Sequence, residues 1–402
     1  MILFAAAIIV LLPLYQLRFA IAGIPLTALE VAVVAFTVIV IVREYRAAWS
    51  FLRDPHTRVV RMIAFGFLVL TTAALFWTPA LRDGLGIWKA YCVEPVLFAF
   101  ALSLVIKKPK DITVLLQAAW ALVIVVSVVA IYQYITGAGI PEPWNAWPDR
   151  RAVGVFSYPN AVGLLLAPII ASAVAYLVHR RFVERFFENT VRQEKLLLFL
   201  AITATILGSI AVVCARADGA VIAIVGSAIV MLLFTRARFF TLAVSAIGLV
   251  LALALPQTRE ILLFRDVSGD VRLALWKGTW NLISHQAITG AGIAAFPQVY
   301  DLYRLPSHVE LLEYSHNLLF DFWTQFGIFG AIWICVTIGI AVKCLYHSRL
   351  STRNATLVLL APIIAICVYG IVDVPYFKND LALLFWTWLA VSYKTLLLGL
   401  KK

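Results

Sequence analysis

Long apolar runs recur along the whole chain, and they restrict what it can fold into. Hydrophobic residues make up 63% of the 402 residues, whereas charged residues make up only 13%. Repeated runs of about 18 or more apolar residues are typical of membrane-spanning helices, and a soluble domain of this length does not contain them. The alternating pattern of membrane β-barrel strands is absent. The sequence therefore predicts an all-α, polytopic integral membrane protein that has the lipid bilayer as a partner.

Twelve apolar runs can be marked, and each predicts one transmembrane helix. They cover roughly 1–20, 28–43, 59–77, 86–106, 112–136, 159–178, 196–214, 217–235, 238–255, 328–346, 356–372 and 381–398. Three parts follow from this layout. Residues 1–255 hold helices one to nine, residues 256–312 form one large loop domain with amphipathic helices, and residues 313–402 hold the last three helices.

The distribution of basic residues predicts the orientation. The net charge of +12 would suggest nucleic acid as a partner of a soluble protein. Here the gaps after even-numbered runs, with the C-terminal tail, hold 21 of the 33 Lys and Arg residues and leave 12 for the other side. By the positive-inside rule both termini are cytoplasmic, and no nucleic-acid partner is needed. The first charge is Arg18, so we expect a retained first span and no cleaved signal.

The loop domain contains a candidate interfacial helix. Ser268-Gly-Asp270 resembles a helix start, and Arg272, Trp276 and Trp280 follow at helical spacing. Two tryptophans one turn apart favour a helix that lies in the membrane interface. The alternative is a lid that only packs against the rest of the protein.

Four outward gaps each contribute a candidate functional residue: Arg151, Arg216, Arg272 and His316. Arginine binds phosphate through a planar fork of donors, and histidine can exchange protons near neutral pH. Such a cluster suits a lipid-linked phosphate or diphosphate. A purely structural role remains open for His316, and Asp218 is a candidate partner that would neutralise Arg216. The outward gaps contain no D-x-D or E-x-D pair, so we expect neither a metal nor another cofactor.

Several motifs resemble one known family. They are His316-Asn317 followed after nine residues by Gly327-x-x-Gly330, Arg151-Ala-Val-Gly-Val-Phe with Pro159-Asn160, Arg216 in a tight hairpin, and Arg272-x-x-x-Trp276 ahead of Gly290-x-Gly292-x-x-x-Phe296. From about residue 150 onward the chain is similar to the O-antigen ligase and O-antigen polymerase superfamily. It departs from the family pattern at Ala215 and Asp218, where Ser and a neutral residue are commoner.

The resemblance implies a GT-C-like membrane glycosyltransferase in the bacterial inner membrane, with a periplasmic active site. It would transfer a glycan from undecaprenyl diphosphate to a sugar hydroxyl with inversion. His316 would be the general base, and Arg216 and Arg272 would stabilise the diphosphate. The remaining candidate substrate-binding residues are Arg151, Asn317, Trp276, Asp373 and Lys378, of which Asn317 could orient His316.

The acceptor distinguishes the functions that this resemblance allows. A ligase would transfer O-antigen to the lipid A–core oligosaccharide, and this is the function we favour. A polymerase would extend the lipid-linked glycan, and a protein oligosaccharyltransferase would use a protein acceptor. A transporter for a lipid-linked sugar is disfavoured, because the charged residues gather at one face and not at the membrane midplane.

Overall fold

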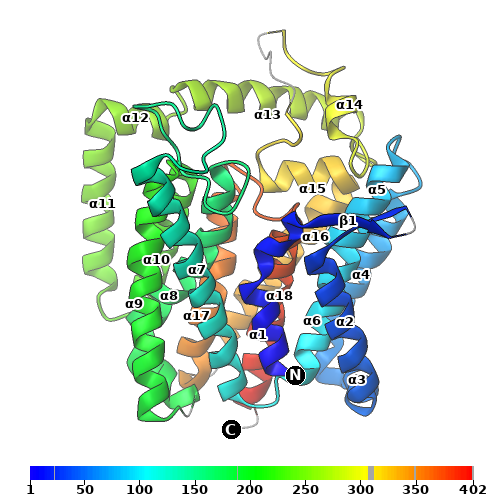
Figure 1. Cartoon of the computed structure of the whole chain (residues 1–402), viewed down its shortest axis with the longest axis vertical. Helices are drawn as coiled ribbons and strands as arrows, with labels where there is room; N and C mark the ends of the chain where they lie inside the picture. The colour runs from blue at the N-terminus through cyan, green and yellow to red at the C-terminus, as the bar shows by residue number, and fades with distance from the viewer. Residues whose placement is uncertain (22, 188, 307–311, 348–349, 401–402) are drawn as a thin grey trace.

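The computed structural model describes residues 1–402 except 22, 188, 307–311, 348–349 and 401–402, and it is predominantly helical (Figure 1). The first part of the chain forms α1 (Ile2–Val10), η1 (Leu12–Gln16), β1 (Arg18–Ile21), β2 (Ile24–Thr27), α2 (Ala28–Arg43), α3 (Tyr45–Arg53), η2 (Pro55–Thr57), α4 (Arg58–Ala74), α5 (Leu81–Ile87), the π-helix η3 (Trp88–Val93), α6 (Glu94–Val105) and α7 (Pro109–Thr136).

The remaining elements are α8 (Asn160–Phe187), α9 (Val191–Cys214), α10 (Asp218–Leu233), α11 (Arg238–Ala254), α12 (Pro256–Leu262), α13 (Val267–His285), α14 (Phe296–Tyr300), α15 (Leu318–Phe326), α16 (Ile328–His347), α17 (Leu350–Tyr369) and α18 (Asn379–Leu400).

Six helical stretches of the described chain are long and apolar enough to cross a membrane. They are Pro55–Ala74, Leu81–Val105, Pro109–Thr136, Asn160–Arg181, Val191–Cys214 and Asn379–Gly399. A seventh arises if α11 and the helices after it, bent by 104°, form one broken span, and three further apolar helices are shorter. The prediction of an all-α polytopic membrane protein is therefore confirmed. The number of twelve spans and the three-part division stay predictions.

The N-terminal apolar run does not form one helix, contrary to expectation. Helix α1 has nine residues, too few for the roughly 20 that span a bilayer. Pro13 lies in the short 3₁₀-helix η1, and a two-stranded antiparallel hairpin follows, with Arg18 paired to Thr27. The positive φ of Gly23 (78°) fits the turn between the strands. Apolar composition alone did not distinguish this hairpin from a helix.

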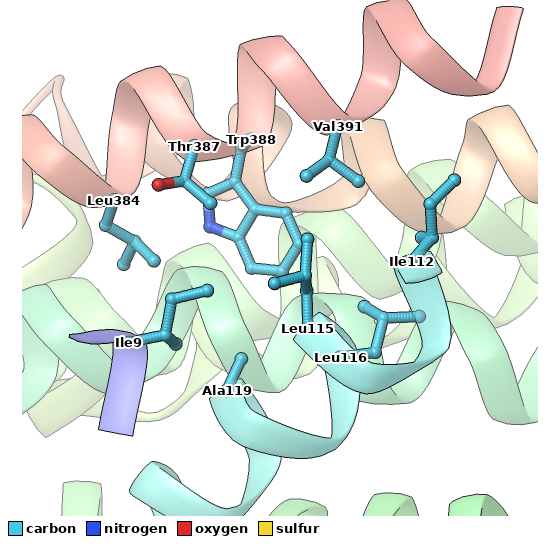
Figure 2. A pocket seen from close by; sticks show the side chains of 9 residues that line it. All are labelled: Ile9, Ile112, Leu115, Leu116, Ala119, Leu384, Thr387, Trp388 and Val391. Carbon is cyan, nitrogen blue, oxygen red and sulfur yellow. The ribbon is translucent and has the colours of Figure 1, made fainter. Parts of the chain in front are cut away.

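Helix α8 lies at the centre of the bundle, where it contacts α7, α9, α10 and α17. Within its candidate span 83% of the residues are buried, compared with 22% for the span that contains α4. Near α1 the packing leaves only a cavity of about 10 Å³ between α1, α7 and α18, lined by residues such as Ile9, Leu115 and Trp388 (Figure 2). That volume holds one water molecule at most, so substrates must bind elsewhere.

The expected helix of the loop domain is present as α13, which crosses over one end of the bundle (Figure 1). It begins after Asp266, whose side chain accepts a hydrogen bond from the Gly269 N–H at 3.2 Å and so caps the helix. Trp280 is 53% exposed, and its ring lies near Phe320 and Trp323 of α15. The helix therefore stacks an aromatic face on α15. Its position in the membrane interface stays a prediction.

Candidate active site

His316 lies in the short segment before α15, where Asn317 fixes the backbone conformation next to it. Its φ is 50°, a left-handed value that is uncommon for a residue other than glycine. Asn317 caps α15, because its Oδ1 accepts hydrogen bonds from the N–H groups of Leu319 and Phe320, both at 3.1 Å. The sequence analysis expected Asn317 to orient the imidazole. The structure places it as a helix cap, so any effect on His316 is transmitted through the backbone.

Asn317 and Leu318 hold the loop between α17 and α18 beside His316. Asn317 Nδ2 donates to the Ile371 carbonyl at 2.9 Å, and the Leu318 N–H donates to the Gly370 carbonyl at 2.7 Å. These bonds bring Asp373 to His316: the imidazole Nδ1 lies 3.3 Å from the Asp373 Oδ1. Although 57 residues separate His316 and Asp373 in sequence, these two hydrogen bonds to backbone carbonyls bring their side chains together.

The Asp373 carboxylate is buried, with 2% of its side chain exposed, whereas the His316 side chain is 17% exposed. Oδ1 of Asp373 also accepts from the Val374 N–H at 2.8 Å, and Oδ2 accepts from Asn160 Nδ2 at 3.4 Å. The Tyr314 ring covers the imidazole at a centroid distance of 4.4 Å. A fixed carboxylate beside Nδ1 orients the imidazole, and this is the arrangement found around histidines that act as general bases.

A further carboxylate lies behind the histidine. Asp321 of α15 is fully buried, and its Oδ1 accepts hydrogen bonds from the backbone N–H and the hydroxyl of Ser315, each at 3.2 Å. Burial raises the pKa of Asp321 to about 7, although the two bonds from Ser315 oppose the shift. Asp321 thus fixes the residue before His316 from inside the protein.

Arg216 occupies the expected tight hairpin between α9 and α10, with a left-handed φ of 48°. Its Nη1 lies 2.8 Å from Asp149 Oδ1, and its Nη2 donates to the Pro148 carbonyl at 2.8 Å. The ion-pair partner of Arg216 is therefore Asp149 and not Asp218, the candidate that the sequence offered. Asp218 is the first residue of α10, where a carboxylate is favoured by the helix dipole. The carboxylate that pairs with Arg216 comes from the loop at 137–158.

Arg151 joins this loop to the hairpin and to the start of α8. Its Nε donates to the Ala215 carbonyl at 3.0 Å, and its Nη2 donates to the Arg216 carbonyl at 3.2 Å and to Asn160 Oδ1 at 2.8 Å. The guanidinium also lies over the Trp144 ring, 5.2 Å from its centroid. Burial lowers the pKa of Arg151. Two of these contacts hold backbone carbonyls of the hairpin, which is the pattern of a residue that positions others.

Asn160 connects the arginine hairpin to the histidine, and we did not select it as a site residue from the sequence. Its Oδ1 accepts from Arg151, and its Nδ2 donates to Asp373, so one amide bridges the two halves of the site. The available signal was a polar residue at the opening of an otherwise apolar helix. That signal is weak, because asparagine is also a common helix cap.

Arg272 reaches the site from α13. Its Nε donates to the Val372 carbonyl at 3.0 Å, next to Asp373, and its Nη1 donates to Ser268 Oγ at 2.6 Å. No ion pair of Arg272 is found among the described residues. The Asp218 carboxylate interacts electrostatically with Arg151, Arg272 and Arg216, so the three guanidinium groups lie near one carboxylate and near one another. Such a region can bind the two phosphates of a lipid-linked donor.

The other two candidate residues are more enclosed. Trp276 is half-buried against Phe264, at a ring distance of 5.4 Å. The ammonium of Lys378 lies over the rings of Phe156 and Tyr15, 4.7 and 4.9 Å from their centroids, and 3.7 Å from Asp380 Oδ2. Burial lowers the pKa of Lys378. Binding of substrate by these two side chains stays a prediction.

The glycine motifs allow two backbone segments to pass in contact. A Cβ on Gly327, which has a φ of 69°, would overlap the Ile288 carbonyl, and a Cβ on Gly290 would overlap the Trp323 carbonyl. The N–H of Ile328 donates to the Ala287 carbonyl at 2.9 Å across this contact. These glycines dock the segment after α13 onto the last turn of α15 and onto the break between α15 and α16.

Within the described part of the chain, no three His, Cys, Asp or Glu side chains gather as metal ligands would. Independence from metal stays a prediction that an assay must test.

Comparison with known proteins gives one family match, over the middle of the chain. Among curated proteins none gives a significant match. Residues 203–335 match the family described as O-Antigen ligase, and this segment runs from α9 into α16 and includes Arg216, Arg272 and His316. This part of the chain therefore carries an O-antigen ligase domain, and three of the candidate residues lie within it.

Proposed function

We propose that this protein transfers O-antigen from undecaprenyl diphosphate to a hydroxyl of the lipid A–core oligosaccharide, at the periplasmic face of the bacterial inner membrane. The observation that supports it best is the joining of two chemical elements in one network. The His316–Asp373 pair is linked through Asn160 to Arg151, and Arg151 holds the backbone of the Arg216 hairpin. A proton acceptor and a site for an anionic leaving group are thereby fixed relative to each other.

The reaction follows from these positions. The acceptor hydroxyl oxygen attacks the anomeric carbon of the glycan while the bond from that carbon to the diphosphate oxygen breaks. His316 takes the hydroxyl proton, which typically accelerates such a step by about 10²–10⁴-fold. Arg216 and Arg272 stabilise the charge that develops on the undecaprenyl diphosphate as it leaves. Attack from the side opposite the leaving group inverts the anomeric centre.

The roles of base and phosphate ligand can be separated by mutation. Arg272→Ala removes a charge-assisted contact worth roughly 1.5–3 kcal/mol, so donor binding should weaken by about 10- to 150-fold along with turnover. His316→Ala should bind the donor almost normally and transfer little. Lys277→Ala is the matched control, because Lys277 is an exposed cation on the same helix. An equal loss of donor affinity in His316→Ala would contradict the general-base role.

The acceptor is tested with purified protein and defined substrates. Given lipid-linked O-antigen and core lipopolysaccharide, the protein should make a ladder of extended lipopolysaccharide on a gel, in excess chelator as well as without it. With the donor alone, the lipid-linked chain should not lengthen. Growth of that chain without core lipopolysaccharide would identify a polymerase, and a product on protein would identify a protein oligosaccharyltransferase.

A further inference from the structure

A second cavity, of about 970 Å³, lies between α3, α4, α6, α16, α17 and α18. Its walls are almost entirely apolar, with residues such as Ile63, Leu68, Phe100, Ile340 and Leu389. This volume is at the upper end of the roughly 300–1,000 Å³ typical of cavities for small molecules. The cavity is therefore large enough for a lipid, and its apolar walls suit hydrocarbon chains.

The cavity is separate from the candidate active site. The rings of Phe67, Trp333 and Trp386 form a cluster, with the Phe67 centroid 4.3 Å from Trp333 and 5.5 Å from Trp386. Trp386 both lines the cavity and donates through Nε1 to Tyr376 at 3.1 Å. These aromatic rings stand between the cavity and the loop that holds Asp373. None of the described lining residues comes from that loop or from the arginine hairpin.

The charged lining of the cavity is exclusively basic. Arg61 lies near the start of α4 and Lys343 near the end of α16, and the imidazole of His56 adds a third nitrogen-bearing side chain. No Asp or Glu is found among the described lining residues. The Arg61 guanidinium donates through Nη1 to the Leu52 carbonyl and through Nη2 to the Asp54 carbonyl at 3.3 Å, but its Nε is buried without a partner in the described chain. An anionic group at this mouth would supply that partner.

Arg61 and Lys343 mark the basic mouth of the cavity. This mouth lies at the end of the bundle opposite α15, since α4 begins beside α3 and α16 runs away from α15 (Figure 1). By the distribution of basic residues this is the cytoplasmic end. Basic pockets between transmembrane helices at that side bind anionic lipid headgroups. The donor itself does not fit this arrangement, because its diphosphate would bind the arginines at the other end.

We propose that this cavity binds an anionic phospholipid of the cytoplasmic leaflet, with its phosphate at Arg61 and its acyl chains between α4, α6, α16 and α18. The bound lipid fills a gap between α4 and the rest of the bundle, and so supports the helices that carry the aromatic cluster. This inference is independent of the proposed transfer reaction.

The test is lipid retention by the purified full-length protein in native mass spectrometry. With phosphatidylglycerol or phosphatidylcholine added in turn, the wild type should retain one phosphatidylglycerol in preference. Arg61→Ala should weaken that binding about fivefold, the effect of one basic side chain at a membrane surface. Arg58→Ala is the matched control, an exposed arginine one turn earlier that does not line the cavity.

Two further measurements test whether the cavity is occupied by the phospholipid or by the isoprenoid tail of the donor. Ala390→Trp, which fills the cavity from α18, should abolish retention, and the inactive His316→Ala protein should retain phosphatidylglycerol as the wild type does. Equal retention of the two phospholipids, or no effect of Arg61→Ala, would overturn the proposal. Displacement of phosphatidylglycerol by undecaprenyl phosphate in the Arg216→Ala protein would also overturn it, in favour of the isoprenoid tail.

Discussion

The contact between Arg216 and Asp149 predicts that a carboxylate of this protein competes with the donor. Both side chains are accessible, with 44% of Arg216 and 81% of Asp149 exposed, and their nearest atoms are 2.8 Å apart. A phosphate that binds Arg216 through the same guanidinium nitrogen must displace Asp149. Replacement of this residue by asparagine removes the negative charge and keeps an oxygen that can accept a hydrogen bond.

The size of the expected change in the KM for the donor follows from the exposure of the Arg216–Asp149 pair. Exposed ion pairs contribute about 0.2–1 kcal/mol, because water and salt screen them. Loss of that competing interaction should lower the KM for the donor by a factor of about 1.4 to 5 in Asp149→Asn. The difference should shrink as the ionic strength rises, since the Debye length falls from about 10 Å at 0.1 M salt to about 3 Å at 1 M.

The assay is the initial rate of glycan transfer at varied donor concentration and saturating acceptor. Asp301→Asn serves as the control, because Asp301 forms a comparable exposed ion pair with Arg304, at 3.0 Å, away from the arginine hairpin. The control should leave the KM for the donor unchanged. A rise in the KM of Asp149→Asn would refute the reasoning, because it would mean that Asp149 holds Arg216 in its productive position.

Three further predictions concern folding, pH and orientation. Gly327→Ala should cost about 2–5 kcal/mol from a left-handed φ and an overlap with backbone, and should lower the unfolding temperature, whereas Gly339→Ala, where a Cβ meets nothing within 4 Å, should not. Burial raises the pKa of Asp321 to about 7, so the protonated carboxyl group of Asp321 stabilises the folded state at low pH. This contribution is lost as the pH rises through about 7. Thermal unfolding should therefore show the wild type losing stability relative to Asp321→Asn between about pH 4 and 7. A membrane-impermeant thiol reagent applied from outside should label a cysteine at Leu302 and not one at Thr190, and the opposite result would invert the predicted orientation.

Apolar runs predicted most helices closely, because a helix in lipid must satisfy its own backbone hydrogen bonds. The run at 28–43 matches α2, and the run at 238–255 matches α11 within one residue. The run at 1–20 failed because the same apolar composition also suits a hairpin, and only Pro13 and Gly23 indicated one. Local composition therefore located helices well and located departures from helix poorly.

Sequence spacing was a poor guide to the partners of charged residues in the site. Asp218, two residues from Arg216, was the nearest carboxylate, yet the start of α10 holds it elsewhere. Asp149, 67 residues away, became the partner because the loop at 137–158 folds over the hairpin. An ion pair between distant loops leaves no periodic signal in one sequence, so only the fold could identify it.

The candidate site residues could be chosen from the sequence because the chemistry of their side chains is specific, but the contacts that position them could not be predicted. Arg151 donates to the Ala215 carbonyl, Arg272 to the Val372 carbonyl and Asn317 to the Ile371 carbonyl. Every residue type offers the same backbone carbonyl, so the identity of the accepting residue carries no information about the contact. Candidate side chains are therefore visible as residue types, whereas the positions of the carbonyls that hold them depend on the path of the backbone. For this reason substitutions at Ala215, Val372 or Ile371 that keep the backbone path should disturb the site less than the loss of Asn160, whose side chain joins Arg151 to Asp373.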